Sequence, residues 1–209
     1  MIADNPCSVR PMEVCEGCNL HGKLMCRFEI QDSVHFFMSI LPFFVTTIAG
    51  VISSGYGWYL LGWLAYAIFF FFVWEGRVLC SHCPYWAGEG RILRCHANYG
   101  VIKIWKYQPG PMSRSEQLQF LVGALLFFIY PLIFLFLGRQ YLLGMIALVS
   151  AFSCIYMVRR NVCSRCINFS CPVNCVPKSL LDAYLSCNPE RRWCMNKFLP
   201  TQSRFSKYF

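Results

Sequence analysis

The chain is poor in charged residues, and acidic residues are the scarcest of them. Only 14% of its 209 residues are charged, whereas a soluble domain carries about 25%. Hydrophobic residues make up 56% of the chain. This composition favours a protein with membrane-spanning segments. Nineteen basic residues stand against 10 acidic ones. Orientation in a membrane and contact with lipid headgroups explain that imbalance, so we predict membrane lipid as a partner and no nucleic-acid binding.

The common catalytic signatures are also missing. The sequence has no phosphate-binding glycine loop, no Ser/His/Asp set and no metalloprotease helix motif. Its N-terminus lacks a basic segment followed by an apolar core, so we expect no cleaved signal peptide. Only His35, of the four histidines, lies near an apolar run, so a bis-histidine haem site is not expected. We therefore predict a redox or structural subunit rather than a stand-alone enzyme.

Long uncharged runs predict four transmembrane helices in two hairpins. Residues 33–74 carry no formal charge, and one crossing needs about 20 residues, so this run is long enough for two. A turn signal at residues 53–57 divides it. Further along, Ser113 and Glu116 form a capping box that starts the third helix. The predicted helices cover residues 34–53, 57–75, 117–138 and 140–158.

Polar, cysteine-rich segments separate and flank the two hairpins. A short amphipathic helix is expected beyond Pro177, on the membrane surface. Four crossings return the chain to its starting side, so these segments share one side, which holds every Lys and Arg except Arg139. The positive-inside rule makes that side cytoplasmic, which predicts an all-α integral protein of the cytoplasmic (inner) membrane with a cytoplasmic cysteine-rich metal-binding cap. The segments are 1–32 (N-terminal Cys-rich segment), 33–75 (first transmembrane hairpin), 76–116 (cytoplasmic loop), 117–158 (second transmembrane hairpin) and 159–209 (C-terminal tail with the amphipathic helix).

Cysteine is abundant, with fourteen residues that lie mostly in these polar segments. Three Cys-x2-Cys pairs can each bring two thiolates to one metal ion or cluster across a tight turn. On the reducing side of a membrane, such pairs favour metal ligation over disulfides. The alternative, in which cysteines pack as small hydrophobic residues, fits Cys154, Cys187 and Cys194 better than it fits the pairs. The pairs are Cys15/Cys18, Cys80/Cys83 and Cys163/Cys166.

The spacing within each set indicates the metal. The tail set is close to the bacterial ferredoxin run C-x2-C-x2-C-x3-C-P and suits a [4Fe–4S] cluster. The loop set, with His82 or His96 as a further ligand, and the N-terminal set could also bind structural zinc. Iron–sulfur is the preferred prediction and zinc the alternative. The tail set is Cys163, Cys166, Cys171 and Cys175; the loop set is Cys80, Cys83, Cys95 and His96; the N-terminal set is Cys7, Cys15, Cys18 and Cys26.

Two short motifs resemble a known family. Residues 76–84 read GRVLCSHCP at the inner end of the second predicted helix, and a cysteine–proline element follows the fourth. In these motifs and in its helix layout the chain resembles the membrane-bound polyferredoxin-type electron-transfer proteins, the quinol-linked subunits associated with periplasmic nitrate reductase and nitrous-oxide reductase systems. The resemblance implies ferredoxin-like clusters in the cytoplasm and electron exchange with a quinol. The chain departs from the family in its two-residue cysteine spacing and in lacking tandem ferredoxin repeats.

The preferred function is electron transfer between a cytoplasmic redox partner and a membrane partner or quinone, as one subunit of a larger complex. A zinc-stabilised membrane scaffold or assembly subunit is the alternative, and a thiol-redox sensor or metal-handling protein is the third hypothesis. Each half of the chain is a hairpin followed by Cys-Ser-x-Cys, which predicts an internal repeat about an axis along the membrane normal. Glu75 and Arg77 could bound a quinone headgroup, but an interfacial ion pair is the preferred interpretation.

Overall fold

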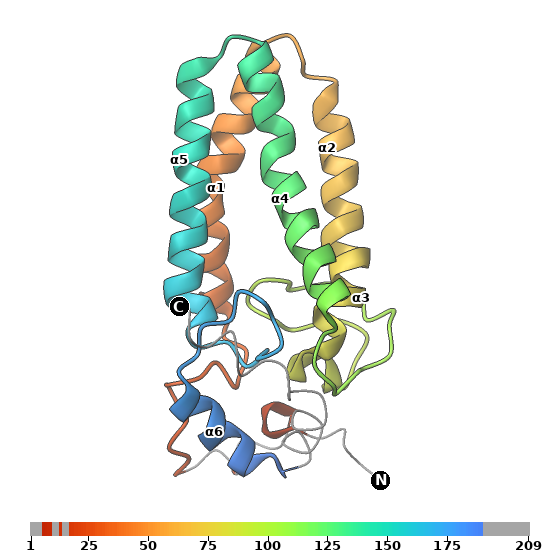
Figure 1. Cartoon of the computed structure of the whole chain (residues 1–209), viewed down its shortest axis with the longest axis vertical. Coiled ribbons are helices and arrows are strands. Elements are labelled where there is room, and N and C mark those ends of the chain that lie inside the picture. Colours follow the sequence, from red (N-terminus) through yellow and green to blue (C-terminus); the bar gives the residue numbers. More distant parts are fainter. Residues whose placement is uncertain (1–5, 10–12, 14–16, 190–209) are drawn as a thin grey trace.

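The computed structural model describes residues 6–9, 13 and 17–189. Within these residues the secondary structure is helical, apart from one isolated bridge between Ile92 and Ile102. Four long helical segments run side by side, and the polar segments gather at one end of them (Figure 1). Each of the four is long and apolar enough to cross a membrane, which confirms the predicted number of helices. They are Ile30–Ser53, Tyr59–His82, Arg114–Leu137 and Tyr141–Cys163.

The observed helices reach farther toward the polar end than the charge pattern predicts. Helix α1 begins four residues before its predicted start, and the second and fourth segments continue past Glu75 and Val158 as far as a cysteine pair. The charge pattern predicts that a helix ends at the first charged residue after an uncharged run. Glu75, however, is buried inside the protein and does not end its helix. The bounds are α1 Ile30–Ser53, α2 Tyr59–Ile68, a π-helix Phe69–Trp74, α3 Glu75–Val78, α4 Arg114–Leu137, α5 Tyr141–Val158 and a π-helix Arg159–Cys163.

The local start and turn signals are found where the sequence predicts them. Ser113 Oγ accepts a hydrogen bond from the Glu116 N–H, and Glu116 Oε2 accepts one from the Ser113 N–H, which completes the capping box of α4. The turn between α1 and α2 contains Gly55 with a φ of 83°. The connection between α4 and α5 passes through Arg139 with a φ of 57°. Both positions have the left-handed backbone that reverses a chain tightly.

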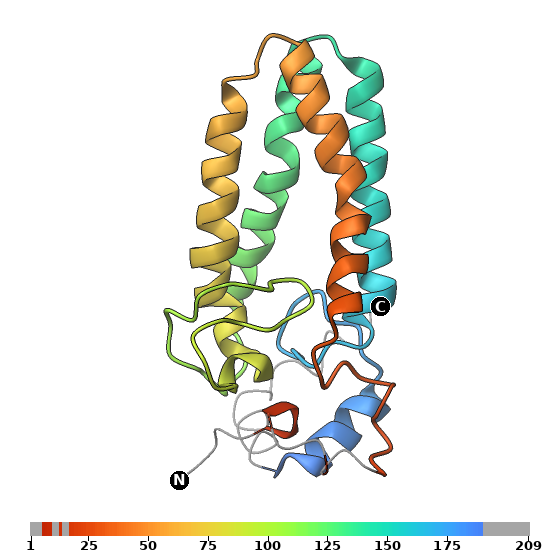
Figure 2. The ribbon, with the colours of Figure 1, turned by 180° about the vertical axis from the view of Figure 1, so that it is seen from behind.

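The helices pair across the two halves of the chain. Helix α1 makes its most extensive contact with α5, and α2 lies beside α4 (Figures 1 and 2). In the predicted internal repeat, α1 of the first half corresponds to α4 of the second, and α2 corresponds to α5. The contact between α1 and α5 then corresponds to the contact between α4 and α2. Both contacts are present, as the predicted repeat requires.

A proline in α4 explains one contact between α2 and α4. Pro131 has no N–H to donate to the carbonyl of Phe127 four residues earlier, so the helix leaves that acceptor free. The indole N–H of Trp63 donates to this carbonyl at 2.9 Å. Nearby, Gly123 leaves room for the Phe70 ring, which a side chain at that position would overlap. Together these contacts hold α2 close against α4.

The polar segments pack into a second region, here called the loop layer (residues 17–29, 79–113 and 164–189). Its core includes Tyr85, Leu93 and Ile167. Helix α6 (Lys178–Cys187) lies at the end of the layer farthest from the long helices (Figure 1). Its apolar residues Tyr184 and Leu185 are buried in that core. The amphipathic helix is therefore confirmed, but its predicted place on a membrane surface is wrong, because the loop layer already covers its apolar face.

Candidate metal centre

The second helical segment delivers Cys80 and Cys83 into the loop layer. Residues Cys80–His82 form a 3-10 turn, and the N–H of Cys83 donates to the carbonyl of Cys80 at 2.9 Å. Pro84 begins a second 3-10 turn directly afterwards, where its fixed φ suits the first position. Both cysteines are buried. Two consecutive tight turns thus hold this Cys-x2-Cys pair just below the helix.

The fourth helical segment ends in the same way. It passes through a π-helix into Cys163, and the N–H of Cys175 donates back to the Cys163 carbonyl at 3.3 Å. The Cys175 thiol also contacts the carbonyl of Arg159 at 3.2 Å. The second helical segment contains a π-helix as well, and such turns occur frequently at functional sites. The two halves therefore share a π-helix as well as a cysteine pair at their polar ends.

Cysteines of different predicted sets lie close to one another. Burial raises the pKa of Cys166 well above its usual value, and the neighbouring thiols of Cys83 and Cys95 raise it further. Each of these thiols, once ionised, would repel the others. The sequence assigned Cys166 to the tail set and the other two to the loop set. The structure brings them into one neighbourhood.

Backbone N–H groups surround some of these sulfurs. Burial raises the pKa of Cys95, while the N–H groups of Ala97 and Asn98 oppose that shift. Burial likewise raises the pKa of Cys171 to about 12, against N–H groups from Val173 and Asn174. N–H donors directed at a sulfur favour its thiolate form. Two half-buried cysteines thus have N–H donors at their sulfurs that a neutral thiol does not need.

Hydrogen bonds to two further cysteines follow the same pattern. The N–H of Asn168 lies 3.5 Å from Cys166 Sγ, and the side-chain amide of Asn98 donates to Cys80 Sγ at 3.3 Å. In iron–sulfur proteins, hydrogen bonds to the ligand sulfurs help to set the reduction potential. The donor set therefore fits thiolate ligands.

His96 is the histidine that best fits the predicted role of a ligand. It is 1% exposed, and neither ring nitrogen has a hydrogen-bond partner. Burial lowers the pKa of His96 to about 4, so the ring is neutral at pH 7. A neutral imidazole offers a lone pair to a metal, and burying both nitrogens without partners is costly.

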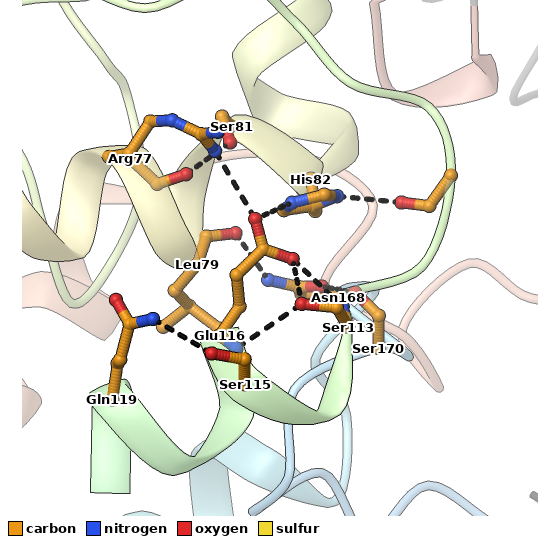
Figure 3. Close-up of polar contacts among 11 residues, drawn as sticks. Arg77, Leu79, Ser81, His82, Ser113, Ser115, Glu116, Gln119, Asn168 and Ser170 are labelled. Carbon is orange, nitrogen blue, oxygen red and sulfur yellow. Dashed lines mark hydrogen bonds and ion pairs between the residues drawn. The ribbon is translucent and has the colours of Figure 1, made fainter. Parts of the chain in front are cut away.

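His82 is held by protein groups instead. Its Nδ1 lies 2.7 Å from the Gly110 carbonyl, and its Nε2 lies 3.5 Å from Glu116 Oε1 (Figure 3). Arg77 reaches the same carboxylate oxygen at 3.2 Å. Because both ring nitrogens face oxygen atoms of the protein, His82 fits the role of a ligand less well than His96, and its interpretation as a ligand stays a prediction.

Glu75 is buried close to the thiols. It is 6% exposed, its carboxyl group hydrogen-bonds to Asn98, and its Oε2 has no hydrogen-bond partner. The predicted interfacial pair between Glu75 and Arg77 is wrong, because Arg77 pairs with Glu116 at the start of α4. This ion pair could not be predicted from sequence spacing, because the two partners are 39 positions apart.

Among the described residues, no three His, Cys, Asp or Glu side chains lie close enough together to hold a single metal ion. Around one zinc ion the sulfurs stand about 3.8 Å apart, given a Zn–S distance of about 2.3 Å. In a [4Fe–4S] cluster each thiolate binds a different iron, so the sulfurs are spread more widely. The side chains as arranged therefore give direct support to neither zinc nor iron–sulfur, and both stay predictions.

The N-terminal set is described only in part. Cys18 and Cys26 are half-buried and pack against the core of the loop layer. Cys15 and Cys194 lie outside the described residues. Cys7 begins a short 3-10 turn, but its side chain is not among the described ones. The predictions for these three thiols therefore stay predictions.

Comparison with known proteins gives no match: no family model, curated protein or solved structure is significantly similar to the chain. The resemblance to polyferredoxin-type proteins therefore remains a prediction from two short motifs and the helix layout. The function has to be argued from the site.

Proposed function

We propose that the chain is an integral membrane iron–sulfur protein that passes electrons between a cytoplasmic redox partner and a membrane partner or quinone. The observation that carries the proposal is the gathering of buried and half-buried thiols from separate segments, with N–H donors at some of their sulfurs, below four apolar helices. In this proposal the loop layer is the cytoplasmic metal-binding cap, and other subunits supply the electron donor or acceptor.

The outer surface of the helices supports the membrane location. Val45, Leu61, Leu125 and Phe152 are exposed, one on each of the four long helices. A continuous apolar surface of this kind requires cover, and lipid chains would provide it. Among the residues that the structure describes, Arg139 is the one Lys or Arg at the opposite end of the bundle, between α4 and α5. By the positive-inside rule the loop layer then faces the cytoplasm.

The chain's own residues would hold and shield the cluster. Cys83, Cys95 and Cys166 would provide thiolates; Cys83 is buried and the other two are half-buried, which would limit the access of water to the sulfurs. The backbone N–H groups of Asn98 and Asn168 would stabilise the charge on Cys95 and on Cys166. When bound, a [4Fe–4S] cluster supplies one-electron redox chemistry. Without metal, a raised pKa would keep thiols such as that of Cys171 protonated, so metal binding must displace protons.

Metal and acid-labile sulfide analysis of anaerobically purified protein tests the proposal. We expect iron and sulfide in about equal amounts, because a [4Fe–4S] cluster contains both equally. Changing Cys95 to Ser is expected to lower both contents. Changing Cys187 to Ser is the matched control, because Cys187 is exposed at the end of α6. Zinc without sulfide in the wild-type protein would contradict the proposal and favour the scaffold alternative.

A further inference from the structure

Asn168 connects the two cysteine turns that follow the second and fourth helical segments. It stands two positions after Cys166 in the tail. The residue is 5% exposed, so its polar groups are shielded from solvent. Its backbone N–H and carbonyl and both ends of its side-chain amide nevertheless have hydrogen-bond partners, which come from both halves of the chain. A buried polar residue with this many partners fixes the positions of its neighbours.

The side chain of Asn168 binds the turn that contains Cys80. Its Nδ2 donates to the carbonyl of Leu79, the residue before Cys80, at 3.3 Å (Figure 3). The same carbonyl accepts the N–H of His82 at 3.3 Å, which is one of the hydrogen bonds that close the 3-10 turn Cys80–His82. Asn168 therefore contacts this turn at a carbonyl on which the turn itself depends.

The main chain of Asn168 belongs to the turn of the tail. Its N–H lies 3.5 Å from Cys166 Sγ, and its carbonyl accepts the N–H of Cys171 at 3.2 Å. Its side-chain oxygen accepts a hydrogen bond from the Ser170 hydroxyl at 3.0 Å, which orients the amide group (Figure 3). The Asn174 side chain donates to the carbonyls of both Cys166 and Asn168, at 2.8 and 3.1 Å. The backbone beside the Cys166 sulfur is thus held on several sides.

The contact between Asn168 and Leu79 joins residues that are 89 positions apart. The distance between the loop turn and the tail turn therefore depends on tertiary contacts such as this one. The side-chain bonds to Leu79 and Ser170 also fix the direction of the N–H that faces Cys166. In iron–sulfur proteins, a hydrogen bond to a ligand sulfur helps to set the reduction potential. One residue thus combines a bond to the first half with a donor to a sulfur of the second.

We propose that Asn168 is a positioning residue, which uses its side-chain bond to Leu79 to hold its own N–H at the sulfur of Cys166 and so sets the reduction potential of the centre that contains this sulfur. The inference rests on the proposed iron–sulfur function. An N–H donor directed at a sulfur favours the form with more negative charge, which is the reduced form. Loss of the side-chain bonds loosens this donor and therefore lowers the potential.

The test is a redox titration of the full chain, purified anaerobically, reduced stepwise with dithionite and followed by electron paramagnetic resonance. Leucine has the branched shape of asparagine but cannot hydrogen-bond, so Asn168→Leu should keep its iron and show a lower midpoint potential. Ser170→Ala removes only the bond to the side-chain oxygen and should lower the potential less. The matched control is Asn188→Leu, because Asn188 is also buried and its Nδ2 donates to the Tyr184 carbonyl at 2.9 Å in α6. This control should leave the potential unchanged.

Amide hydrogen exchange tests the link between the two turns separately. In Asn168→Leu, residues 79–83 should exchange faster, although the change lies in the tail, whereas Asn188→Leu should leave their exchange as in the wild-type protein.

The outcomes separate this inference from the proposed function. If Asn168→Leu has the wild-type potential, or if exchange of residues 79–83 is unaffected, the inference is overturned and the iron–sulfur proposal still stands. If the leucine variant does not fold, Ser170→Ala decides, since a lower potential supports the inference and an unchanged one overturns it. Absence of iron from the wild-type protein would overturn both.

Discussion

Glu116 has two separate structural roles, and the sequence predicted only one of them. The capping box could be predicted because it depends on residues three positions apart. The contacts of the same carboxylate with Arg77 and His82 could not, because they depend on how the two halves of the chain pack. His96 was predicted as a ligand from its position next to Cys95, but only the structure shows two buried ring nitrogens without partners.

Replacing Glu116 separates these roles. Glutamine can still close the capping box, so Glu116→Gln should lose only the contacts with Arg77 and His82, which are partly exposed and contribute less than about 1 kcal/mol. Glu116→Ala should also lose the cap, for a total of about 1–2 kcal/mol. Thermal unfolding in detergent, followed by circular dichroism, measures both. Glu89→Gln is the control, because Glu89 is exposed. If the Glu116→Ala variant were as stable as the Glu89→Gln variant, neither the cap nor the contacts with Arg77 and His82 would contribute to stability.

Gly123 should not tolerate a side chain. A Cβ at this position would overlap the Phe70 ring, so Gly123→Ala is expected to push α2 and α4 apart and destabilise the protein by about 1–3 kcal/mol. Thermal unfolding is again the measurement. Gly57→Ala is the matched control, because its nearest neighbouring atom would be 3.8 Å away. Adding Phe70→Leu to the Gly123→Ala variant should restore part of the lost stability, because the smaller side chain makes room for the new Cβ. If it does not, overlap with the Phe70 ring is not the cause of the destabilisation.

At the scale of elements, the middle loop contains a hairpin that the sequence did not predict. Ile92 and Ile102 form its bridge and are more than half exposed, while Leu93 and Val101 are buried in the loop layer. Residues 91–106 contain four basic side chains and no acidic one. The hairpin was missed because this basic segment alternates apolar and polar residues over only a few positions, too few for a clear strand pattern.

The hairpin is fastened to the end of the second long helix. The indole N–H of Trp105 donates to the carbonyl of Val73 at 3.1 Å, and the Arg77 guanidinium lies 6.0 Å from the Trp105 ring centre. The Trp105 end of the hairpin therefore lies beside the last part of the candidate membrane span. Apolar side chains beside basic ones suit the interface of an anionic bilayer.

We expect the hairpin to contact anionic lipid in the membrane that the proposed function requires. Amide hydrogen exchange of residues 91–106 should be slower in nanodiscs with phosphatidylglycerol than in nanodiscs with phosphatidylcholine alone. Changing Arg91, Arg94 and Lys106 to Gln should remove that difference, because each basic residue contributes about 1 kcal/mol at an anionic surface. The control is Lys178→Gln on α6, which is at the far end of the loop layer. Equal exchange in the two lipids would contradict the expectation.

At the scale of the whole molecule, the number of long helices and their common polar end could be predicted from hydropathy and charge alone. The grouping of the cysteines could not. Spacing along the chain assigned Cys166 to the tail set, whereas the structure places it near Cys83 and Cys95. The cause is the pairing of helices across halves, α1 with α5 and α2 with α4, which brings the loop and the tail together. The sequence contains no short-range signal for such pairing.

The proposed orientation can be checked by limited trypsin digestion of sealed vesicles. Cleavage at Arg91, Arg94 and Lys106 is expected only in inverted vesicles, where the cytoplasmic face is outside. Arg139 lies at the opposite end of the bundle, so a cut there is expected only in right-side-out vesicles. Cleavage of the middle loop in right-side-out vesicles would reverse the orientation.

The most direct test of the central claim is electron paramagnetic resonance of the anaerobically purified protein after reduction with dithionite. An iron–sulfur protein is predicted to bleach in the visible range and to show a signal that integrates to about one unpaired electron per reduced cluster. A colourless protein that contains zinc and gives no signal before or after reduction would contradict the account.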